Sequence, residues 1–495
     1  MEFLCSLIWG EFQARHLPGL SLLPGVGATA NIGMSENLAQ QLEKSIPGLE
    51  VSVDPSELEY YGRDWTSHWH PDPRLIAFPA DIAQVQSLVY FAVKHQLPLV
   101  PSGGRTGLSG GAVAAYKEAV VSFDRMNRII DLDPVDQILT VQAGVTTAQV
   151  QAHAASHGLF FPVSFASEGS SQIGGNVATN AGGVRVLRYG LTRDWVAGLK
   201  VVTGTGQLLD LNSGLVKNAS GYDLRHLMIG SEGTLGLVVE VSLALTSPPL
   251  PQGVLLLGLN NLDAVMPVFT AVRRKLVLSA FEFFTDKALA RVIGEHALEQ
   301  PLESSCPIYV LAEFDNSGGV SEDGALAVFE RCVEAGWVAD GVISQSNAQA
   351  DSLWQYRELI TESIHRHSPY KNDLSVRVSR VTDFLAELDA LVSDYYPDFE
   401  VIWFGHIGDG NLHMNILKPE NLDRTDFESA CQQVDKLVFD LVRKYRGSIS
   451  AEHGVGLLKK PWLTHSRSAA ELDLMRATKA VFDPSGILNP GKLVD

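Results

Sequence analysis

The sequence predicts an α+β protein with more than one domain. Its 495 residues exceed what one hydrophobic core usually serves, which suggests two or three domains. From about residue 80 onward, segments with helical periodicity alternate with short strand-like apolar runs. The proline-rich stretch SPPLPQG at 247–253 separates this region from a second one, in which strands such as GVLLLGL again alternate with helical stretches.

Composition narrows the class of protein and of partner. Lys and Arg number 38 against 57 Asp and Glu, a net charge of −19, which argues against nucleic acid or an anionic membrane as the main partner. An anionic substrate must therefore meet a local basic pocket. No apolar run reaches the ~20 residues of a membrane span, and the N-terminus lacks the basic segment of an export signal. The four cysteines, at positions 5, 306, 332 and 431, show no paired spacing, which favours a reducing, cytoplasmic compartment.

The N-terminal part contains one clear helix signal and an extension before it. We expect residues 1–33 to be a disordered or non-conforming extension, with translation starting at Met1 or Met34. Ser35 is a suitable N-cap for the helix SENLAQQLEKS, and Glu36 favours its first turn. Further helices are predicted at 81–96 and 146–158, and strands around 97–104, 119–126, 138–144, 196–204 and 228–245.

Three glycine-rich segments indicate a cofactor that carries phosphate. PSGGRTGLSGGAV at 101–113 follows a predicted strand, but its glycine spacing and the strand after it exclude the dinucleotide-binding fingerprint. Its backbone N–H groups can instead form a nest for a pyrophosphate. QIGGNVATNAGG at 172–183 offers a second bare backbone for a flat ligand, and GSEGTLG at 230–236 offers a third segment.

The stretch HIGDGNLH at 406–413 places two histidines around an Asp-Gly pair, which is the strongest short signal for a β-hairpin. With Asp409 and Gly410 at the tip of a two-residue turn, His406 would lie directly opposite His413. Directly opposed residues have Cβ atoms about 4.5–5.5 Å apart, which suits two imidazoles that bind one metal ion. Two histidines supply only half of a tetrahedral shell, so a pair of half-buried strand histidines is the alternative.

Seven segments together resemble one protein family. They are PSGGRTGLSGG, GSSQIGGNVATNAGGVRVLRYG, VKNASGYDL, GSEGTLGLV, FGHIGDGNLHMNI, SAEHGVGLLKK and DPSGILNPGK. In this order they are similar to the flavin-dependent D-2-hydroxy-acid dehydrogenases of the vanillyl-alcohol-oxidase type, and within that family to the bacterial D-2-hydroxyglutarate dehydrogenases. The resemblance covers the chain from about residue 40 to the C-terminus.

This resemblance implies a two-lobed FAD-binding domain at 34–248, an α+β cap domain for the substrate at 249–450, and a C-terminal segment at 451–495 that returns to the FAD domain. It also implies the residues around FAD. Those along the pyrophosphate are Ser102, Gly103, Gly104, Arg105, Thr106 and Gly107; those along the ribityl chain and isoalloxazine are Gly174, Gly175, Asn176, Thr179, Asn180 and Gly182, with Glu232, Gly233 and Thr234 nearby. Neither glycine loop contains the histidine or cysteine that tethers the flavin in some relatives, so we expect FAD to be bound non-covalently.

At the reaction centre, the resemblance adds Glu452 of SAEHGVG to His406 and His413 as a third metal ligand. Two histidines and a carboxylate form a catalytic zinc set with an open position, which the hydroxyl and C1 carboxylate of a 2-hydroxy acid would fill. Because adjacent residues of an extended segment point to opposite faces, Glu452 could hold the metal while His453 faces the substrate as general base. A fourth-ligand role for His453 is the alternative. Asn411 would hydrogen-bond the substrate, or else serve only as a turn residue.

The far end of the substrate is assigned from LWQYRELITESIHRHSPYKND at 353–373. Arg357 and Thr361 are four apart in a helical pattern and therefore share a face, and Lys371 follows the break at Pro369. Taken with the resemblance, these residues suggest a pocket for a second carboxylate, and hence oxidation of D-2-hydroxyglutarate to 2-oxoglutarate. The alternative is a solvated helix face.

Three other functions stay open on the sequence alone. They are dehydrogenation of D-lactate, glycolate or D-malate, metal-dependent hydrolysis with the glycine loops merely structural, and a non-redox flavin lyase or transferase. The sequence contains no iron–sulfur spacing, haem motif or nicotinamide fingerprint, so electrons are expected to leave to an external acceptor such as an electron-transfer flavoprotein or a quinone. The oligomeric state is open, a homodimer included.

Overall fold

Residues 26–66 and 68–495 are described by the computed structural model of the chain. Most of the predicted extension at 1–33 therefore lies outside the described residues. The first helix, α1 (Val26–Ser45), begins before the predicted N-cap at Ser35, so that predicted start is wrong. Serine costs at most about 0.7 kcal/mol inside a helix, so it does not stop a helix that has already begun.

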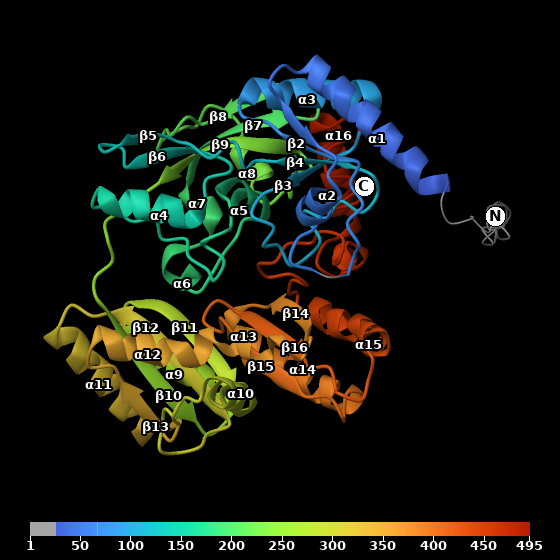
Figure 1. Cartoon of the computed structure of the whole chain (residues 1–495). Coiled ribbons are helices and arrows are strands. Elements are labelled where there is room, and N and C mark those ends of the chain that lie inside the picture. The colour runs from blue at the N-terminus through green and yellow to red at the C-terminus, as the bar shows by residue number, and fades with distance from the viewer. Residues whose placement is uncertain (1–25, 67) are drawn as a thin grey trace, which may run out of the picture.

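The N-terminal half forms two lobes, at the top of Figure 1. The first lobe contains a four-stranded sheet in the order β1-β2-β4-β3, in which β2, β4 and β3 are parallel and β1 is antiparallel. Asp81 caps α3 by accepting the N–H of Gln84, and the apolar side of this helix lies in the core of the lobe. The elements after α1 are β1 (Glu50–Ser52), α2 (Pro55–Tyr61), β2 (Leu75–Phe78), α3 (Ile82–His95), β3 (Leu99–Ser102) and β4 (Ala119–Ser122).

The second lobe contains a five-stranded antiparallel sheet in the order β5-β6-β9-β7-β8. Val202, Leu237 and Val239 of this sheet pack with apolar residues of the first lobe, so the two lobes share a core. The elements are β5 (Ile129–Asp133), β6 (Ile138–Gln142), α4 (Thr147–Ser156), α5 (Ile173–Thr179), α6 (Val186–Tyr189), α7 (Thr192–Trp195), β7 (Val196–Thr203), β8 (Leu208–Leu211), α8 (Arg225–Met228) and β9 (Gly236–Ala244).

A seven-stranded antiparallel sheet, in the order β13-β10-β12-β11-β15-β16-β14, forms the lower half of Figure 1. Its strands are β10 (Gln252–Leu259), β11 (Leu278–Thr285), β12 (Ile308–Asp315), β13 (Val338–Ile343), β14 (Tyr370–Ser375), β15 (Val401–Gly405) and β16 (Asn411–Ile416). Its helices are α9 (Val265–Lys275), α10 (Asp286–His296), α11 (Gly319–Glu334), α12 (Asn347–Glu358), α13 (Ile360–His365), α14 (Val381–Tyr395) and α15 (Arg424–Lys444), with short 3₁₀ turns η1 (Leu262–Ala264) and η2 (Val378–Arg380).

The two faces of this sheet are covered differently. Apolar residues of α9, α11, α14 and α15 pack on one face, whereas α10, α12 and α13 pack on the other. Side chains alternate between faces along a strand, so Glu282, Asp373 and His413 all lie on the second face, because their chain neighbours belong to the core of the first. The second face therefore carries polar residues in addition to the apolar residues that pack against α10, α12 and α13.

The C-terminal segment returns to the N-terminal lobes. After η3 (Lys460–His465), helix α16 (Ala469–Phe482) lies among the elements of the first lobe in Figure 1, and Leu488 forms a bridge to Leu99 of β3. The predicted α+β class, with a two-lobed N-terminal part, a cap sheet and a returning C-terminus, is confirmed. Among the described residues, no helix combines the length and apolarity that a membrane crossing requires.

A buried ion pair holds α16 in place. Lys479 donates to Asp483 Oδ2 at 2.9 Å and to the carbonyl oxygens of Thr234 and Leu488 at 3.0 and 2.8 Å. Replacing Lys479 with Met should lower the free energy of unfolding by about 3–5 kcal/mol, since it leaves the Asp483 carboxylate buried without a cation. The exposed pair of Lys436 and Asp440 provides the control, because Lys436→Met should cost less than about 1 kcal/mol. Urea unfolding of both variants checks this, and equal midpoints would contradict it.

Candidate active site

The predicted hairpin exists, but its turn is longer than two residues. Phe404 of β15 lies opposite His413 of β16, and both Asp409 and Asn411 donate their N–H groups to the carbonyl of His406. The direct pairing of His406 with His413 is therefore wrong. Gly410 has a φ of +88° and approaches the chain so closely that a Cβ would lie 2.1 Å from the Val376 carbonyl oxygen, so contacts with the next strand override the local turn preference.

The two histidines nevertheless share a face of the sheet. The register differs from the predicted one by an even number of residues, which leaves every side chain on the same face. The ring centroids of His406 and His413 are 5.1 Å apart, with the rings at 86° to one another. Parity along the strands, rather than the turn type, brings this pair together.

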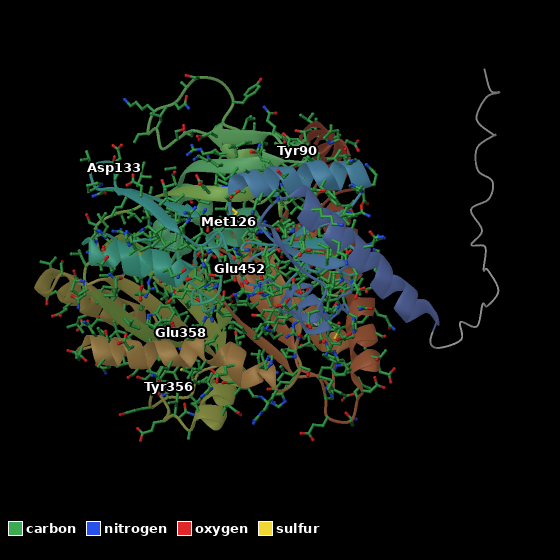
Figure 2. The ribbon with its side chains drawn as sticks, turned by 45° about the horizontal axis from the view of Figure 1, so that its top comes forward. Tyr90, Met126, Asp133, Tyr356, Glu358 and Glu452 are labelled. Atoms are coloured by element: carbon green, nitrogen blue, oxygen red, sulfur yellow. The ribbon has the colours of Figure 1, made fainter. Side chains whose placement is uncertain are left out.

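Glu452 lies between the imidazoles. Its Oε1 atom is 3.9 Å from Nε2 of His406, 3.8 Å from Nε2 of His413 and 3.6 Å from Nε2 of His453. Figure 2 labels Glu452 near the centre of the molecule, between the N-terminal lobes and the seven-stranded sheet. The three predicted metal ligands and the predicted base are thus gathered in one cluster.

Two buried carboxylates orient the histidines from behind. Nδ1 of His406 lies 2.8 Å from Glu282, and Nδ1 of His413 lies 3.6 Å from Asp373, which turns both Nε2 atoms toward Glu452. Carboxylate partners of this kind fix the tautomer and orientation of histidines that bind metals. Burial opposes protonation of His406, but the charge of Glu282 and its hydrogen bond raise the pKa of His406 to about 9. Burial, reinforced by His406, lowers the pKa of His413, while burial raises the pKa of Glu452 to about 7.

Asp373 belongs to a second set of potential ligand atoms. Atoms of Asp373, His413, Glu452 and His453 all lie within 4.8 Å of one another. Asp373 Oδ2, however, accepts the backbone N–H groups of residues 451, 452 and 453 at 3.0, 2.9 and 3.1 Å. This carboxylate is therefore committed to protein N–H donors. The donors that remain around Glu452 are the imidazoles of His406, His413 and His453, and two of these with the Glu452 carboxylate fit a zinc ion.

The segment that carries Glu452 and His453 is not extended. Because Asp373 gathers three successive N–H groups, both side chains enter the same cluster, and the predicted opposite orientation is wrong. His453 also lines a cavity of about 320 Å³, together with Lys371 and Lys459. Burial lowers the pKa of His453, so the ring is neutral at neutral pH and can accept a proton.

The residues predicted for the distal carboxylate are only partly brought together. Lys371 is half-buried in the cavity; burial lowers its pKa, and no ion pair of its ammonium group is found among the described residues. Arg357 is buried outside the cavity lining, 2.8 Å from Glu282, and its Nε atom has no hydrogen-bond partner within the described part of the chain. Thr361 is exposed on α13, so the predicted face shared with Arg357 is wrong, because the helix is interrupted at Leu359.

Asn411 faces the protein rather than the cavity. Its amide nitrogen donates to Asp373 Oδ1 at 2.8 Å and to the carbonyl of Leu374 at 3.0 Å. Both donors are therefore used, and only the amide oxygen is left for a ligand. In this structure Asn411 fixes the position of Asp373.

The glycine loops fit a bulky polar ligand. Ser102 Oγ and Gln172 Oε1 are buried, and neither has a hydrogen-bond partner in the part of the chain that the structure describes. A Cβ on Gly104 would lie 2.0 Å from the Ser170 carbonyl oxygen, whereas one on Gly175 would meet nothing within 4 Å. The two loops thus meet closely at one point, present open space at another, and keep two polar atoms free for a cofactor.

Several predicted cofactor residues already have partners in the protein. Arg105 lies 4.6 Å from the ring centroids of Tyr60 and Tyr61, and Glu232 is buried with its carboxylate on the C-terminal segment. The segment QIGGNVATNAGG is mostly the helix α5, ending at Asn180 with a φ of +52°. The remaining side-chain contacts are Asn176 to Thr147, Thr179 to the Gly175 carbonyl, Asn180 to the Arg193 N–H and Thr234 to the Ser231 carbonyl. These residues shape the loops. A Cβ would fit at Gly103 and Gly107, with its nearest atoms at 3.5 and 3.4 Å, whereas Gly174, Gly182 and Gly233 pack against protein atoms at 2.7 Å or less.

Sequence reasoning missed four residues of the site. Glu282 stands alone in the apolar strand LSAFEFFT, and an isolated acid in a buried strand is a usable signal, because such a residue is almost always paired. Asp373 follows Lys371 at a spacing of two, which puts both on one face of β14. Gln172 is recognised only from its unpartnered side-chain oxygen at the second glycine loop, and Lys459 only from its place in the cavity lining.

Comparisons with known proteins agree with this geometry. Residues 73–212 match the family model described as FAD binding domain, and residues 249–493 match the one described as FAD linked oxidases, C-terminal domain. The D-2-hydroxyglutarate dehydrogenase of Xanthomonas citri pv. viticola is 55% identical over 462 residues, 93% of this chain and 98% of that protein. The enzyme of the same name from Stutzerimonas stutzeri is 55% identical over 456 residues, 92% and 98% of the two chains.

A solved structure supports the fold independently. The crystal structure of p-cresol methylhydroxylase with substrate bound superposes with a TM-score of 0.74 at 16% identity, covering 93% of this chain and 96% of that one. At such low identity the likeness concerns the fold alone, whereas the two bacterial relatives are each 55% identical to this chain over nearly their whole length. The chain therefore belongs to the FAD-linked oxidases of the vanillyl-alcohol-oxidase type and, within them, to the family of the D-2-hydroxyglutarate dehydrogenases.

Proposed function

We propose that this chain oxidises D-2-hydroxyglutarate to 2-oxoglutarate, using non-covalently bound FAD and a zinc ion, and passes the electrons to an external acceptor such as an electron-transfer flavoprotein or a quinone. The observation that carries the proposal is the meeting of His453 and Lys371 in one cavity beside the cluster of His406, His413 and Glu452. The name of the 55% identical relatives supports the choice of substrate.

The two cofactors would be held by different parts of the chain. The glycine loops at 102–107 and 174–182 would hold FAD, which supplies the acceptor for the hydride that leaves C2 of the substrate. His406, His413 and Glu452 would hold zinc, which lowers the pKa of the substrate hydroxyl when bound. The hydroxyl and the C1 carboxylate of the substrate would bind at this cluster.

His453 would accept the hydroxyl proton. Its Nε2 atom faces the cluster, and its Nδ1 atom is 3.7 Å from Asp373 Oδ2. When Nε2 takes the proton, His453 becomes an imidazolium. The negative charge of the buried Asp373 carboxylate would stabilise that positive charge. Loss of that proton and of the C2 hydride together convert the alcohol to the ketone.

The distal carboxylate would bind at the cationic end of the site. Lys371 has no ion pair among the described residues and lies in the cavity, and Arg357 keeps a buried Nε–H group without an acceptor. A substrate that brings a second carboxylate would supply an anion for the Lys371 ammonium group in the cavity. D-Lactate has no group to do so, and should be a poor substrate.

Removing the metal should stop turnover without releasing the flavin, because the proposed ligands lie outside the glycine loops. Exhaustive chelation should leave a yellow protein that D-2-hydroxyglutarate does not bleach under anaerobic conditions, and stoichiometric zinc should restore bleaching. Metal content and flavin absorbance are measured on the same sample. Full activity with no metal present would refute the zinc mechanism.

Substituting His453 with Ala should lower the rate of flavin reduction by about 10²–10⁴-fold, the usual contribution of a positioned general base. Zinc should stay bound, because the proposed ligands are intact, whereas His413→Ala should lose zinc as well as activity. His157, an exposed residue at the end of α4, provides a control variant with wild-type behaviour. If the His453→Ala protein lacks zinc, His453 is a ligand and the base lies elsewhere.

Replacing Lys371 with Met should lower kcat/KM for D-2-hydroxyglutarate. The loss should correspond to about 2–5 kcal/mol of transition-state binding, the usual cost of removing one partner of a buried ion pair. D-Lactate, which does not reach Lys371, should be affected far less, so the preference ratio should collapse. Lys436→Met, on the exposed side of α15, is the matched control. An equal loss for both substrates would place Lys371 at the shared C1 carboxylate.

A further inference from the structure

The segment 451–456, which carries Glu452 and His453, is held at both ends by buried carboxylates. At one end, Asp373 of the seven-stranded sheet accepts the N–H groups of residues 451–453. At the other end, Glu232 accepts the N–H groups of Val455 at Oε1 and Gly456 at Oε2, both at 2.7 Å. The two carboxylates come from different halves of the molecule.

Glu232 is built into the flavin-binding half. It lies in GSEGTLG, just before β9, with a φ of +52°. Asn489 donates to its carbonyl oxygen at 2.7 Å and to that of Gly111 at 2.9 Å. A Cβ on Gly456 would lie 2.2 Å from the carbonyl oxygen of Ser109, so the segment packs directly on the second part of the first glycine-rich segment, 101–113.

Among the described residues, the hydrogen bonds of the Glu232 carboxylate are all made to this segment. Glu232 is 6% exposed, and each of its carboxylate oxygens accepts one N–H group of the segment. A Cβ on Gly454 would lie 3.2 Å from Oε1, and one on Gly111 of the first glycine-rich segment would lie 3.4 Å from Oε2. Lys492 is fully buried nearby and supplies compensating charge, while its ammonium group has no hydrogen-bond partner in the described part of the chain. Burying a carboxylate costs free energy unless its oxygens accept hydrogen bonds. The two N–H groups of the segment provide those hydrogen bonds to Glu232.

We propose that Glu232 is a positioning residue for the reaction: its carboxylate holds residues 454–456 on the flavin-binding half and thereby fixes where Glu452 and His453 stand relative to the flavin. This inference rests on the proposed function, because it concerns the placement of the proposed ligand and base. Hydride transfer needs the substrate carbon within reach of the flavin, and misplacement by about 1 Å can cost 10²-fold in rate. The residue therefore acts through the segment and not by touching FAD.

The direct test is amide hydrogen exchange on the full chain with FAD and zinc bound. Glu232→Gln keeps the size of the side chain but turns an amide NH₂ toward one of the two N–H donors. Exchange at residues 455–456 should rise by about tenfold or more, as expected for the loss of hydrogen bonds to a charged acceptor. Exchange in the glycine loop at 102–107 should be unchanged. The opposite pattern, with faster exchange at 102–107 only, would overturn the proposal and assign Glu232 to the flavin loop.

The kinetic test separates positioning from general stabilisation. In Glu232→Gln the rate of flavin reduction at saturating D-2-hydroxyglutarate should fall by about 10–100-fold, while KM changes less than about threefold and bound FAD and zinc stay stoichiometric. Loss of FAD with an unchanged rate per flavin would overturn the proposal. If Glu232→Gln does not fold, Glu232→Asp keeps the charge but shortens the reach, and should give the same exchange pattern.

Glu118→Gln is the matched control. Glu118 is also buried, lies 3.8 Å from the Lys492 ammonium group and accepts the N–H of Tyr116, but within the described part of the chain it forms no hydrogen bond or ion pair with residues 451–456. Glu118→Gln should leave amide exchange at residues 455–456 unchanged. Faster exchange there would mean that the loss of any buried charge in this region has the same effect, which would contradict the proposal. If the wild-type protein does not oxidise D-2-hydroxyglutarate, the proposed function fails, while the exchange measurement still decides whether Glu232 anchors the segment.

Discussion

The active site depends on one buried carboxylate, that of Asp373 on β14. One of its oxygens accepts three successive backbone N–H groups, and the other accepts the amide of Asn411. Burying a carboxylate costs on the order of several kcal/mol of free energy unless its lone pairs accept hydrogen bonds. Residues 451–453 therefore bend so that their N–H groups point at Asp373. That bend is the reason why Glu452 and His453, neighbours in sequence, reach the same cluster instead of pointing apart.

Around Asp373, burial outweighs the charge of the carboxylate in setting the protonation of the neighbouring imidazoles. Burial opposes the ionisation of Asp373, but His453, His413 and Lys459 hold the pKa of this carboxyl well below its ordinary value. Burial in turn lowers the pKa of the two imidazoles beside it, and a metal ligand or proton acceptor must be neutral. His406 differs, because Glu282 raises its pKa to about 9, so binding of a metal there would release a proton.

Features that depend on the alternation of side chains along a strand, or on the order of motifs, could be predicted from the sequence. Features that depend on contacts between residues far apart in the chain could not. His406 and His413 share a face because an even register shift preserves it, although the turn itself was mispredicted. The assignment of Glu452 came from the family resemblance and not from the hairpin. Thr361 and Arg357 were expected on one face, but the interruption at Leu359 breaks the helical spacing. The bonds from residues 452 and 455 to Asp373 and Glu232 join positions 79 and 223 apart in the chain, which no local pattern reports.

The site lies where two separately built halves meet, so its geometry depends on their relative placement. Each half has its own core, and Val184 and Leu187 of the N-terminal half pack against the cores of the seven-stranded sheet. Among the polar contacts across the boundary, Arg188 to Asp315 is partly exposed and contributes little. Arg185, by contrast, forms two hydrogen bonds to the buried Glu313, which also accepts from Trp354, so one bidentate pair ties α6 to the sheet. Bidentate geometry restrains orientation as well as distance. Together with the segment 451–456, this pair restrains the flavin-binding half against the half that carries the histidines, and such restraint at two separated points resists rotation as well as translation.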